Sequence, residues 1–226
     1  MESKIATTLG AGLDVPGLRR EDLETLADRH IDQALKVPEA LTVRGTRISF
    51  LETGIGIATL AILRHRNQAG SSSSNSWVGY MSVLDCALRN IVREDNHSST
   101  ANDDGCEVLY GRAGLLYAFL LLRNALHQGF FNDLASELVR QLNQIVTMDN
   151  LRLITDSIIV RGRRGSRWLR EELGIAVKTG QMFPPLMWSW HQKRYLGAAH
   201  GVGGLKATLE DMFIRVSSSW HFTNAP

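Results

Sequence analysis

One histidine is a candidate for acid–base chemistry because its neighbours are small and a glycine follows it. His200 ends the run Tyr-Leu-Gly-Ala-Ala-His of residues 195–200, directly before an apolar, helix-forming segment. The positive end of a helix dipole favours the neutral imidazole, and a neutral imidazole can exchange protons near pH 7. Small neighbours leave room for a substrate. We therefore predict that His200 is a general acid or base; the alternative is a histidine that only caps the helix.

Glycines that turn into an apolar helix occur three times in the chain. Gly111–Leu115 and Gly201–Leu205 align as Gly-x-x-Gly-Leu, and Gly54–Gly56 is one residue shorter. Such turns would gather helix N-termini, with their unpaired amide groups, around one end of a common axis. The arrangement suits an anionic or electron-rich substrate and suits close helix packing equally well. A phosphate-binding loop is excluded, because no strand precedes the glycines and no Gly-Lys-Ser/Thr is present.

The other histidines, cysteines and arginines are weaker candidates. A metal site formed by Cys86, His97 and Cys106 is disfavoured, because these residues lack the short spacing of zinc ligands. His30 lies on an apolar helix stripe and is predicted to be a packed core residue. His65, His127 and His191 are predicted to lie on the surface. For a basic patch we predict a solvated helix–loop–helix junction rather than a nucleic-acid site. The patch consists of Arg161, Arg163, Arg164, Arg167 and Arg170.

The elements that must position these residues show helical periodicity, with almost no strand-like alternation. Apolar residues three or four apart predict four amphipathic helices, over 23–35, 76–92, 132–146 and 166–177. Polar residues rich in serine, asparagine and glycine predict exposed loops within one domain over 67–76 and 94–105.

A second kind of helix is apolar on every side and begins at glycine. These segments cover residues 54–63, 114–122 and 204 onward. A helix that is apolar all round must be enclosed by protein. The alternation of the two kinds predicts an inner and an outer layer of helices, and therefore an all-α fold.

Composition fits a globular protein and excludes several classes of function. The chain has 226 residues, of which 44% are hydrophobic and 21% charged. A net charge of +2 gives no reason to expect nucleic acid or an anionic membrane as partner. The longest apolar stretch, Ala113–Leu122, is far shorter than the roughly 20 residues of a membrane span, so no transmembrane segment is predicted. With two cysteines and no recognisable signal sequence, we expect a cytoplasmic protein.

The motifs together resemble the eukaryotic lanthionine synthetase C-like (LanC-like) family. The strongest similarity is in Leu109–Tyr117 and in Pro185–His191, which continues into Lys193–Gly201; Ser49–Leu63 is a looser match. The similar region covers about residues 48–210. The resemblance implies an α/α toroid of the six-hairpin type, in which Gly-x-x-Gly turns open the inner helices. This agrees with the two layers inferred from the periodicity.

The resemblance also implies a chemistry and a site residue. Family members add a cysteine thiol to dehydroalanine or dehydrobutyrine to form a thioether, and eukaryotic relatives are associated with glutathione as the thiol donor. His200 matches the family's active-site histidine, which acts in proton transfer at the enolate formed when the thiolate adds. Glutathione or a dehydroamino-acid peptide is thus the expected partner.

The cofactor of the family is zinc, and here the sequence departs from the pattern. Zinc activates the thiol through a cysteine and a later Cys-His pair, all beyond the Ala-His-Gly motif. Neither Cys86 nor Cys106 matches a ligand position, and the sequence contains no Cys-His pair. A thiol of ordinary pKa, about 8.5, is mostly protonated at neutral pH. We therefore expect no bound zinc and no zinc-dependent activity from this chain alone.

We treat residues 1–226 as one truncated LanC-like domain, a partial toroid. Residues 211–226 form an atypical tail, because Ser217–Ser219 and the Ala-Pro ending give no helical stripe. The open edge of a partial toroid would expose apolar surface of its inner helices. Self-association through that edge is therefore expected.

Two other functions stay open at this point. The chain could be a non-catalytic scaffold that binds glutathione or a peptide. It could also be a carbohydrate-active enzyme, since sugar hydrolases use α/α toroids too, although a shared fold is a weak argument for function. Such an enzyme needs two carboxylates across a cleft, and only Glu52 and Glu107 lie next to the glycine turns.

Overall fold

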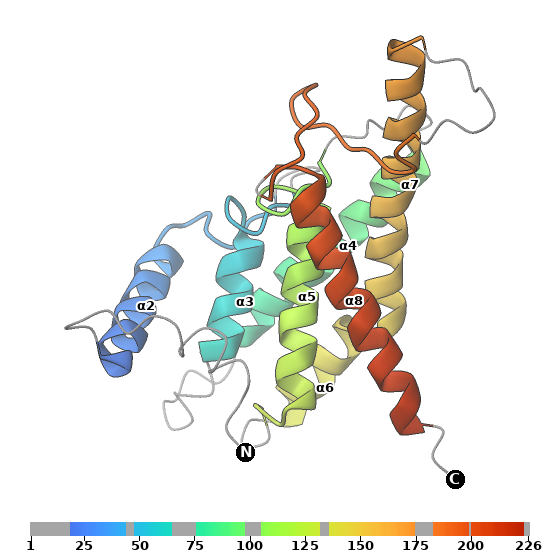
Figure 1. Cartoon of the computed structure of the whole chain (residues 1–226). Helices are drawn as coiled ribbons and strands as arrows, with labels where there is room; N and C mark the ends of the chain where they lie inside the picture. The colour runs from blue at the N-terminus through green and yellow to red at the C-terminus, as the bar shows by residue number, and fades with distance from the viewer. Residues whose placement is uncertain are drawn as a thin grey trace.

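The computed structural model describes residues 19–43, 48–64, 76–97, 105–131, 136–174, 183–198 and 200–223. Every regular element in this part of the chain is a helix, and the one β-type pairing there is an isolated bridge between Trp190 and Lys193 (Figure 1). The predicted all-α class is confirmed. The helices are α2 (Arg20–Leu35), α3 (Gly54–Arg64), α4 (Ser76–His97), α5 (Arg112–His127), α6 (Ser136–Ile145), α7 (Met148–Glu172) and α8 (Val202–Thr223).

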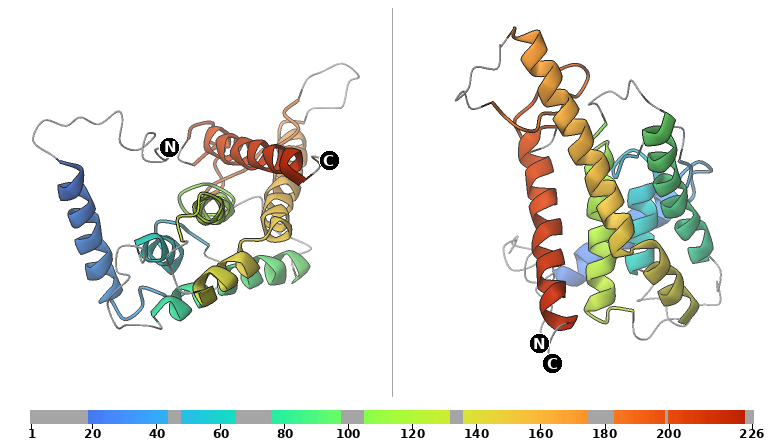
Figure 2. Two further views of the ribbon diagram at one scale, coloured as in Figure 1. Left: turned by 90° about the horizontal axis from the view of Figure 1, so that it is seen from below. Right: turned by 90° about the vertical axis from the view of Figure 1, so that its right-hand side faces the viewer.

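The helices form two layers, as the alternation of amphipathic and apolar segments predicts. Helices α3, α5 and α8 pack side by side in that order, and α4, α6 and α7 cover them from one side (Figure 2). Helix α2 precedes α3 and packs against it. Inner helices are thus separated along the chain by one outer helix, α4, or by two, α6 and α7. This double layer is consistent with an α/α toroid.

The middle inner helix is enclosed most completely. In α5, Leu115, Leu116, Phe119 and Leu122 are all fully buried. Burial of each large apolar side chain contributes roughly 1.5–3 kcal/mol. Helix α5 contacts α3, α6, α7 and α8, so it is the centre of the hydrophobic core.

Helix α7 corrects one prediction. The expected junction near residue 166 is wrong, because a single helix of 25 residues runs from Met148 to Glu172. The side chain of Thr147 caps its start by accepting a hydrogen bond from the Asn150 amide. Gly162, a helix breaker in isolation, serves packing here: the indole of Trp188 lies where a side chain would be, 2.5 Å from the Cβ position.

Three further predictions need correction, and a fourth falls outside the described residues. His30 is exposed on α2 and is not a core residue. Helix α4 continues to His97, so Glu94 and Asp95 belong to a helix rather than to a loop. Helix α8 continues to Thr223, through the tail for which no helical stripe is visible. The serine run at 71–74 lies outside the described residues.

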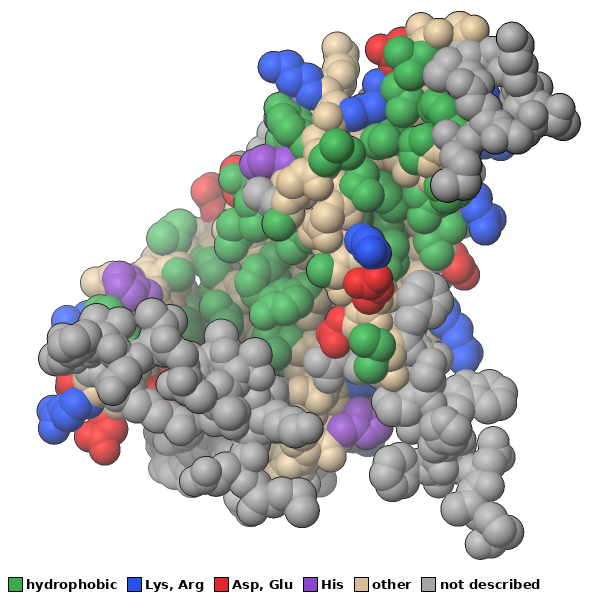
Figure 3. All heavy atoms as spheres, viewed as in Figure 1, with side chains coloured by type: hydrophobic (Ala, Val, Ile, Leu, Met, Phe, Trp, Pro, Cys, Tyr) green, Lys and Arg blue, Asp and Glu red, His purple; other side chains and the backbone are tan. Residues whose placement is uncertain are grey.

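Apolar side chains gather over the inner helices on one face of the molecule (Figure 3). Each inner helix has a large apolar residue that is well exposed: Leu60 at 42%, Tyr117 at 44% and Ile214 at 68%. Such a surface fits the expected self-association, which stays a prediction. No described helix is long and apolar enough to cross a membrane.

Alanine at Gly114 is expected to destabilise the fold, whereas alanine at Gly79 is expected to stabilise it. A Cβ at Gly114 would overlap the carbonyl oxygen of Val108 and lie 3.0 Å from the Cβ of Phe50. Overpacking of this kind costs roughly 1–3 kcal/mol. At Gly79, inside α4, the nearest atom would be 3.7 Å away, so the lower backbone entropy of alanine contributes about 0.5–1 kcal/mol.

Urea unfolding followed by helical circular dichroism measures both variants. Equal effects of the two replacements would contradict the close approach of α5 to the preceding loops.

Candidate functional site

The starts of the three inner helices are built in the same way. A side chain at Gly56, Gly114 or Gly204 would overlap the carbonyl oxygen of the residue six positions earlier, which is Phe50, Val108 or Ala198. The three segments are therefore equal in length, and the shorter spacing read from Gly54–Gly56 is wrong. Thr53 occupies the place that Gly111 and Gly201 fill in the other two, and its hydroxyl donates to the Ser49 carbonyl.

The loops before these helices contact one another in sequence order. Ser49 Oγ donates to the Leu109 carbonyl at 3.0 Å, and the Leu51 amide donates to the same carbonyl at 3.3 Å. Phe50 lies against Gly114, and Val108 lies against Gly204. The helix N-termini consequently meet at one end of the layer, as the glycine pattern predicts (Figure 1).

Glu107 connects the loop before α5 to the loop before α8. One carboxylate oxygen accepts from the Tyr110 amide at 2.8 Å, and the other lies 2.9 Å from Nδ1 of His200. The Glu107 side chain is 2% exposed, whereas that of His200 is 32% exposed. The imidazole is therefore held by a buried carboxylate, while about a third of the His200 side chain remains exposed.

The pairing with Glu107 bears on which ring nitrogen of His200 carries the proton. Burial raises the pKa of Glu107 above its usual value, and the hydrogen bond with His200 partly offsets this effect. When Glu107 is ionised it accepts the proton of Nδ1, which assigns the lone pair of the neutral ring to Nε2. Nε2 is then the nitrogen that can exchange a proton with a ligand.

Aromatic rings surround the imidazole. The rings of Tyr110 and Trp190 stack on each other with centroids 5.4 Å apart, and the imidazole is nearly parallel to both, at 5.6 Å and 5.9 Å. Tyr195 is tilted against it at 6.1 Å. These rings restrict the orientation of the imidazole plane.

The segment that carries Trp190 is attached to α7. The Met187 amide donates to the Gly162 carbonyl, and Trp188 Nε1 donates to the Ile158 carbonyl at 2.8 Å. At the end of α7, Glu172 forms an ion pair with Arg194 at 2.8 Å. Helix α7 thus supports the segment that carries Trp190 toward the start of α8.

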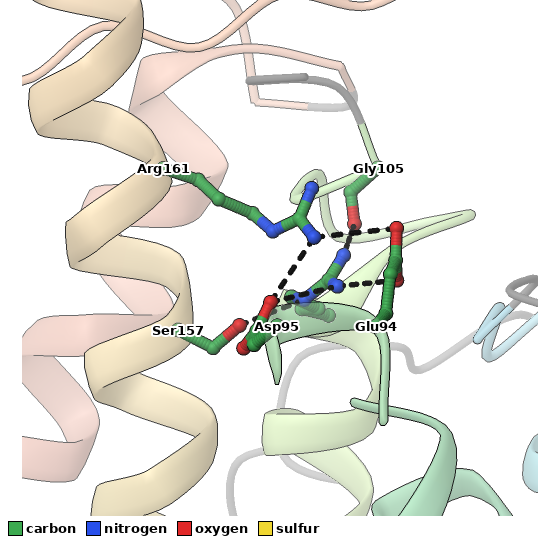
Figure 4. A network of polar contacts seen from close by, with 6 residues as sticks. Glu94, Asp95, Gly105, Ser157 and Arg161 are labelled. Atoms are coloured by element: carbon green, nitrogen blue, oxygen red, sulfur yellow. Dashed lines mark hydrogen bonds and ion pairs between the residues drawn. The ribbon is translucent and has the colours of Figure 1, made fainter. Parts of the chain in front are cut away.

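A buried polar network anchors the loop of Glu107 from the opposite side (Figure 4). Arg112, at the start of α5, donates to Ser157 Oγ at 2.9 Å and to the Gly105 carbonyl, and pairs with Glu94. Arg161 pairs with Glu94 and Asp95 at 3.2 Å and 3.1 Å. Side chains of α4, α5 and α7 therefore meet at the base of the loop that holds Glu107.

The positions of the other candidate residues exclude some of the roles predicted for them. Arg161 is 3% exposed and belongs to this network, so its prediction as a solvated residue is wrong. Cys86 is half-buried and Cys106 is buried. Among the described residues, no three His, Cys, Asp or Glu side chains lie close enough to hold a metal ion. These residues do not provide the zinc ligands that the resemblance implies. His127 and His191 are exposed, as predicted.

Sequence reasoning did not assign Glu107 to His200. The two residues are 93 positions apart, and Glu107 drew attention only as a carboxylate for sugar hydrolysis. A usable signal exists: Glu107 precedes Gly111 by four residues, and Gly197 precedes Gly201 by four. At the position four residues before the turn glycine, the second repeat thus has an acid and the third repeat, which contains His200, has a glycine.

Comparison with known proteins agrees with this construction. The family model described as "Lanthionine synthetase C-like protein" matches residues 17–213, which is most of the chain and includes α2 and the helix starts that surround His200. This match agrees with the all-helical double layer and with the glycine turns at the inner helices. The chain belongs to the lanthionine synthetase C-like family.

Proposed function

We propose that this chain acts in the addition of a thiol to a dehydroamino-acid residue, with His200 as the proton-transfer residue. The observation that carries the proposal is the pairing of His200 Nδ1 with the buried carboxylate of Glu107, which leaves Nε2 for a ligand. A neutral imidazole with a fixed tautomer is suited to general acid–base catalysis.

The proposed step balances as follows. The sulfur of a thiolate attacks Cβ of dehydroalanine or dehydrobutyrine and forms the C–S bond. The π electrons of the Cα=Cβ bond move to Cα and its carbonyl group, which gives an enolate. Protonated His200 delivers the proton of Nε2 to Cα, and Glu107 stabilises the imidazolium before this transfer. Solvent then restores the proton on His200.

The thiolate has to be supplied by other means. The described residues hold no zinc site, and a thiol such as glutathione with a pKa near 8.5 is mostly protonated at neutral pH. We therefore expect this chain alone to show little glutathione addition at pH 7, while a thiol that is already ionised should react in a His200-dependent way.

A pair of thiols tests this expectation. Glutathione and an acidic aromatic thiol, 2-nitro-5-thiobenzoate, are each incubated at pH 7 with a dehydroalanine peptide, and the adduct is quantified by mass spectrometry. With the aromatic thiolate we expect wild-type protein to exceed His200→Asn by roughly 10²-fold or more. With glutathione we expect both proteins to remain near the uncatalysed rate.

The same samples distinguish the other functions. Equal rates of wild-type protein and His200→Asn with the aromatic thiolate would contradict the proposal. Stoichiometric zinc in the purified protein together with glutathione turnover would contradict the expected dependence on preformed thiolate. Glutathione binding by calorimetry without any addition would favour the scaffold. Sugar hydrolysis is disfavoured, because both oxygens of Glu107 are used by Tyr110 and His200.

A further inference from the structure

The turn next to the site has an unusual backbone. His191 and Gln192 have φ values of 49° and 61°, in the left-handed region that residues with a Cβ rarely adopt. Two such residues in succession form the centre of a tight hairpin, which the paired backbone bonds of Trp190 and Lys193 close at 2.8 Å and 3.0 Å. Asparagine and glycine are the usual residues of this turn, and here neither is present.

Strain of this kind persists where surrounding contacts require the conformation. The contacts here belong to Trp190. Its indole stacks on Tyr110, lies parallel to the His200 imidazole within 3° and meets the His191 ring edge-on at 4.3 Å. The turn therefore presents a large flat surface to His200.

The hydrogen bond between Glu107 and His200 depends on the plane of the imidazole. Nδ1 reaches the carboxylate only in one orientation of the ring, and one-third of the His200 side chain is open to solvent. The groups that face His200 are Glu107 and Tyr110 from the loop before α5, and Trp190 and Tyr195 from the segment before α8. Trp190 has the largest ring among them.

We propose that Trp190 is a positioning residue for His200, and that the left-handed turn at His191 and Gln192 holds its indole against the imidazole. This inference rests on the proposed role of His200, and its test is independent of activity. Without the indole, the imidazole would rotate away from Glu107. It would then adopt the tautomer that free histidine prefers in water, with the proton on Nε2.

Histidine tautomers are read directly from ¹⁵N chemical shifts of the ring nitrogens. In ¹⁵N-histidine-labelled wild-type protein at pH 8, the His200 signals, assigned by their absence in His200→Asn, should show the proton on Nδ1. In Trp190→Leu they should move toward the pattern of free histidine. Trp190→Phe retains a flat ring and should retain most of the wild-type pattern.

A matched pair of substitutions tests the turn itself, with the indole still present. Glycine adopts a positive φ, so Gln192→Gly should preserve the wild-type tautomer. Proline is fixed near −65°, so Gln192→Pro should break the turn and reproduce the Trp190→Leu spectrum. Because Gln192 is exposed, neither change alters the core, and circular dichroism verifies the fold.

The outcomes separate the two proposals. A wild-type spectrum with the proton on Nε2 would overturn the pairing with Glu107 and this inference with it. A wild-type spectrum with the proton on Nδ1 that persists in Trp190→Leu would overturn the positioning role alone. The expected series of spectra in a protein that adds no thiol would support the positioning role and refute the proposed function.

Discussion

Replacing Arg112 by alanine is expected to destabilise the protein by about 3 kcal/mol, the lower end of the range for breaking a buried ion pair. The Arg112 side chain is 2% exposed, and its loss would leave Ser157 and the Gly105 carbonyl without this donor. Glu94 and Asp95 are 24% and 35% exposed, so water would solvate them in part. This partial solvation is the reason for choosing the lower value.

Arg89→Ala is the matched control for this experiment. Arg89 forms an ion pair with Asp85 on the same helix as Glu94, but its side chain is 68% exposed. Exposed pairs of this type contribute only a few tenths of a kcal/mol. Urea unfolding of both variants measures the difference in the free energy of unfolding. A similar small loss in both would mean that the network contributes no more than a surface pair.

Arg112→Ala should also affect His200, because the network and the site share one loop. The Arg112 guanidinium binds Gly105 at the beginning of the segment that carries Glu107 and Tyr110. A looser loop would weaken the bond from Glu107 to Nδ1. The His200 ring signals should therefore shift toward the free-histidine pattern.

The layered fold could be predicted because it depends on local periodicity. Apolar residues recur every three or four positions along α4, and α3 and α5 are apolar nearly all round, so the sequence distinguishes outer from inner helices. His200 could be proposed as a site residue from its small neighbours and the glycine after it, and its role stays a prediction. Both inferences use residues that are close in the sequence.

The errors concern charged residues whose partners are distant in the sequence. Arg161 lies among other arginines and resembles a surface residue, yet it pairs with Asp95, 66 positions earlier. Glu94 and Asp95 resemble the start of a polar loop, yet they extend α4 because their charges are compensated by α5 and α7. Periodicity cannot reveal such compensation, since it depends on which helices become neighbours.

Glu107→Gln is expected to remove the activity while preserving or increasing stability. Glutamine can still accept the Tyr110 amide proton with its oxygen, but its amide nitrogen would then donate to Nδ1 of His200. The neutral imidazole would be forced into the opposite tautomer, with its proton on Nε2. Protonation of Nδ1 would then face an amide N–H instead of a carboxylate, so the imidazolium that delivers the proton would lose its stabilising partner. The corresponding Asp-to-Asn change in a catalytic triad, in another protein, costs about 10⁴-fold in rate.

The stability change of this variant depends on pH with a definite sign. Because burial raises the pKa of Glu107 above the ordinary 4.5, the folded protein favours the protonated carboxyl. Wild-type stability from this group is fully present below pH 4.5 and is lost as the pH rises through the folded pKa. Glutamine cannot ionise, so the free energy of unfolding of Glu107→Gln should exceed that of wild type at neutral pH. The difference should become smaller toward pH 4.

Three measurements on Glu107→Gln test this account, with Glu52→Gln as the control. Glu52 is an exposed carboxylate beside the first glycine turn, so its replacement should leave stability, tautomer and thiolate addition unchanged. Urea unfolding at pH 4 and pH 7, ¹⁵N shifts of His200 and the aromatic thiolate assay are compared for both variants. A Glu107→Gln protein that keeps the wild-type tautomer and full rate would refute the role of the carboxylate. Loss of a sugar-hydrolase activity in both variants would instead support the carbohydrate hypothesis, because a hydrolase needs two carboxylates. Proton delivery by His200 needs only one of the two, Glu107.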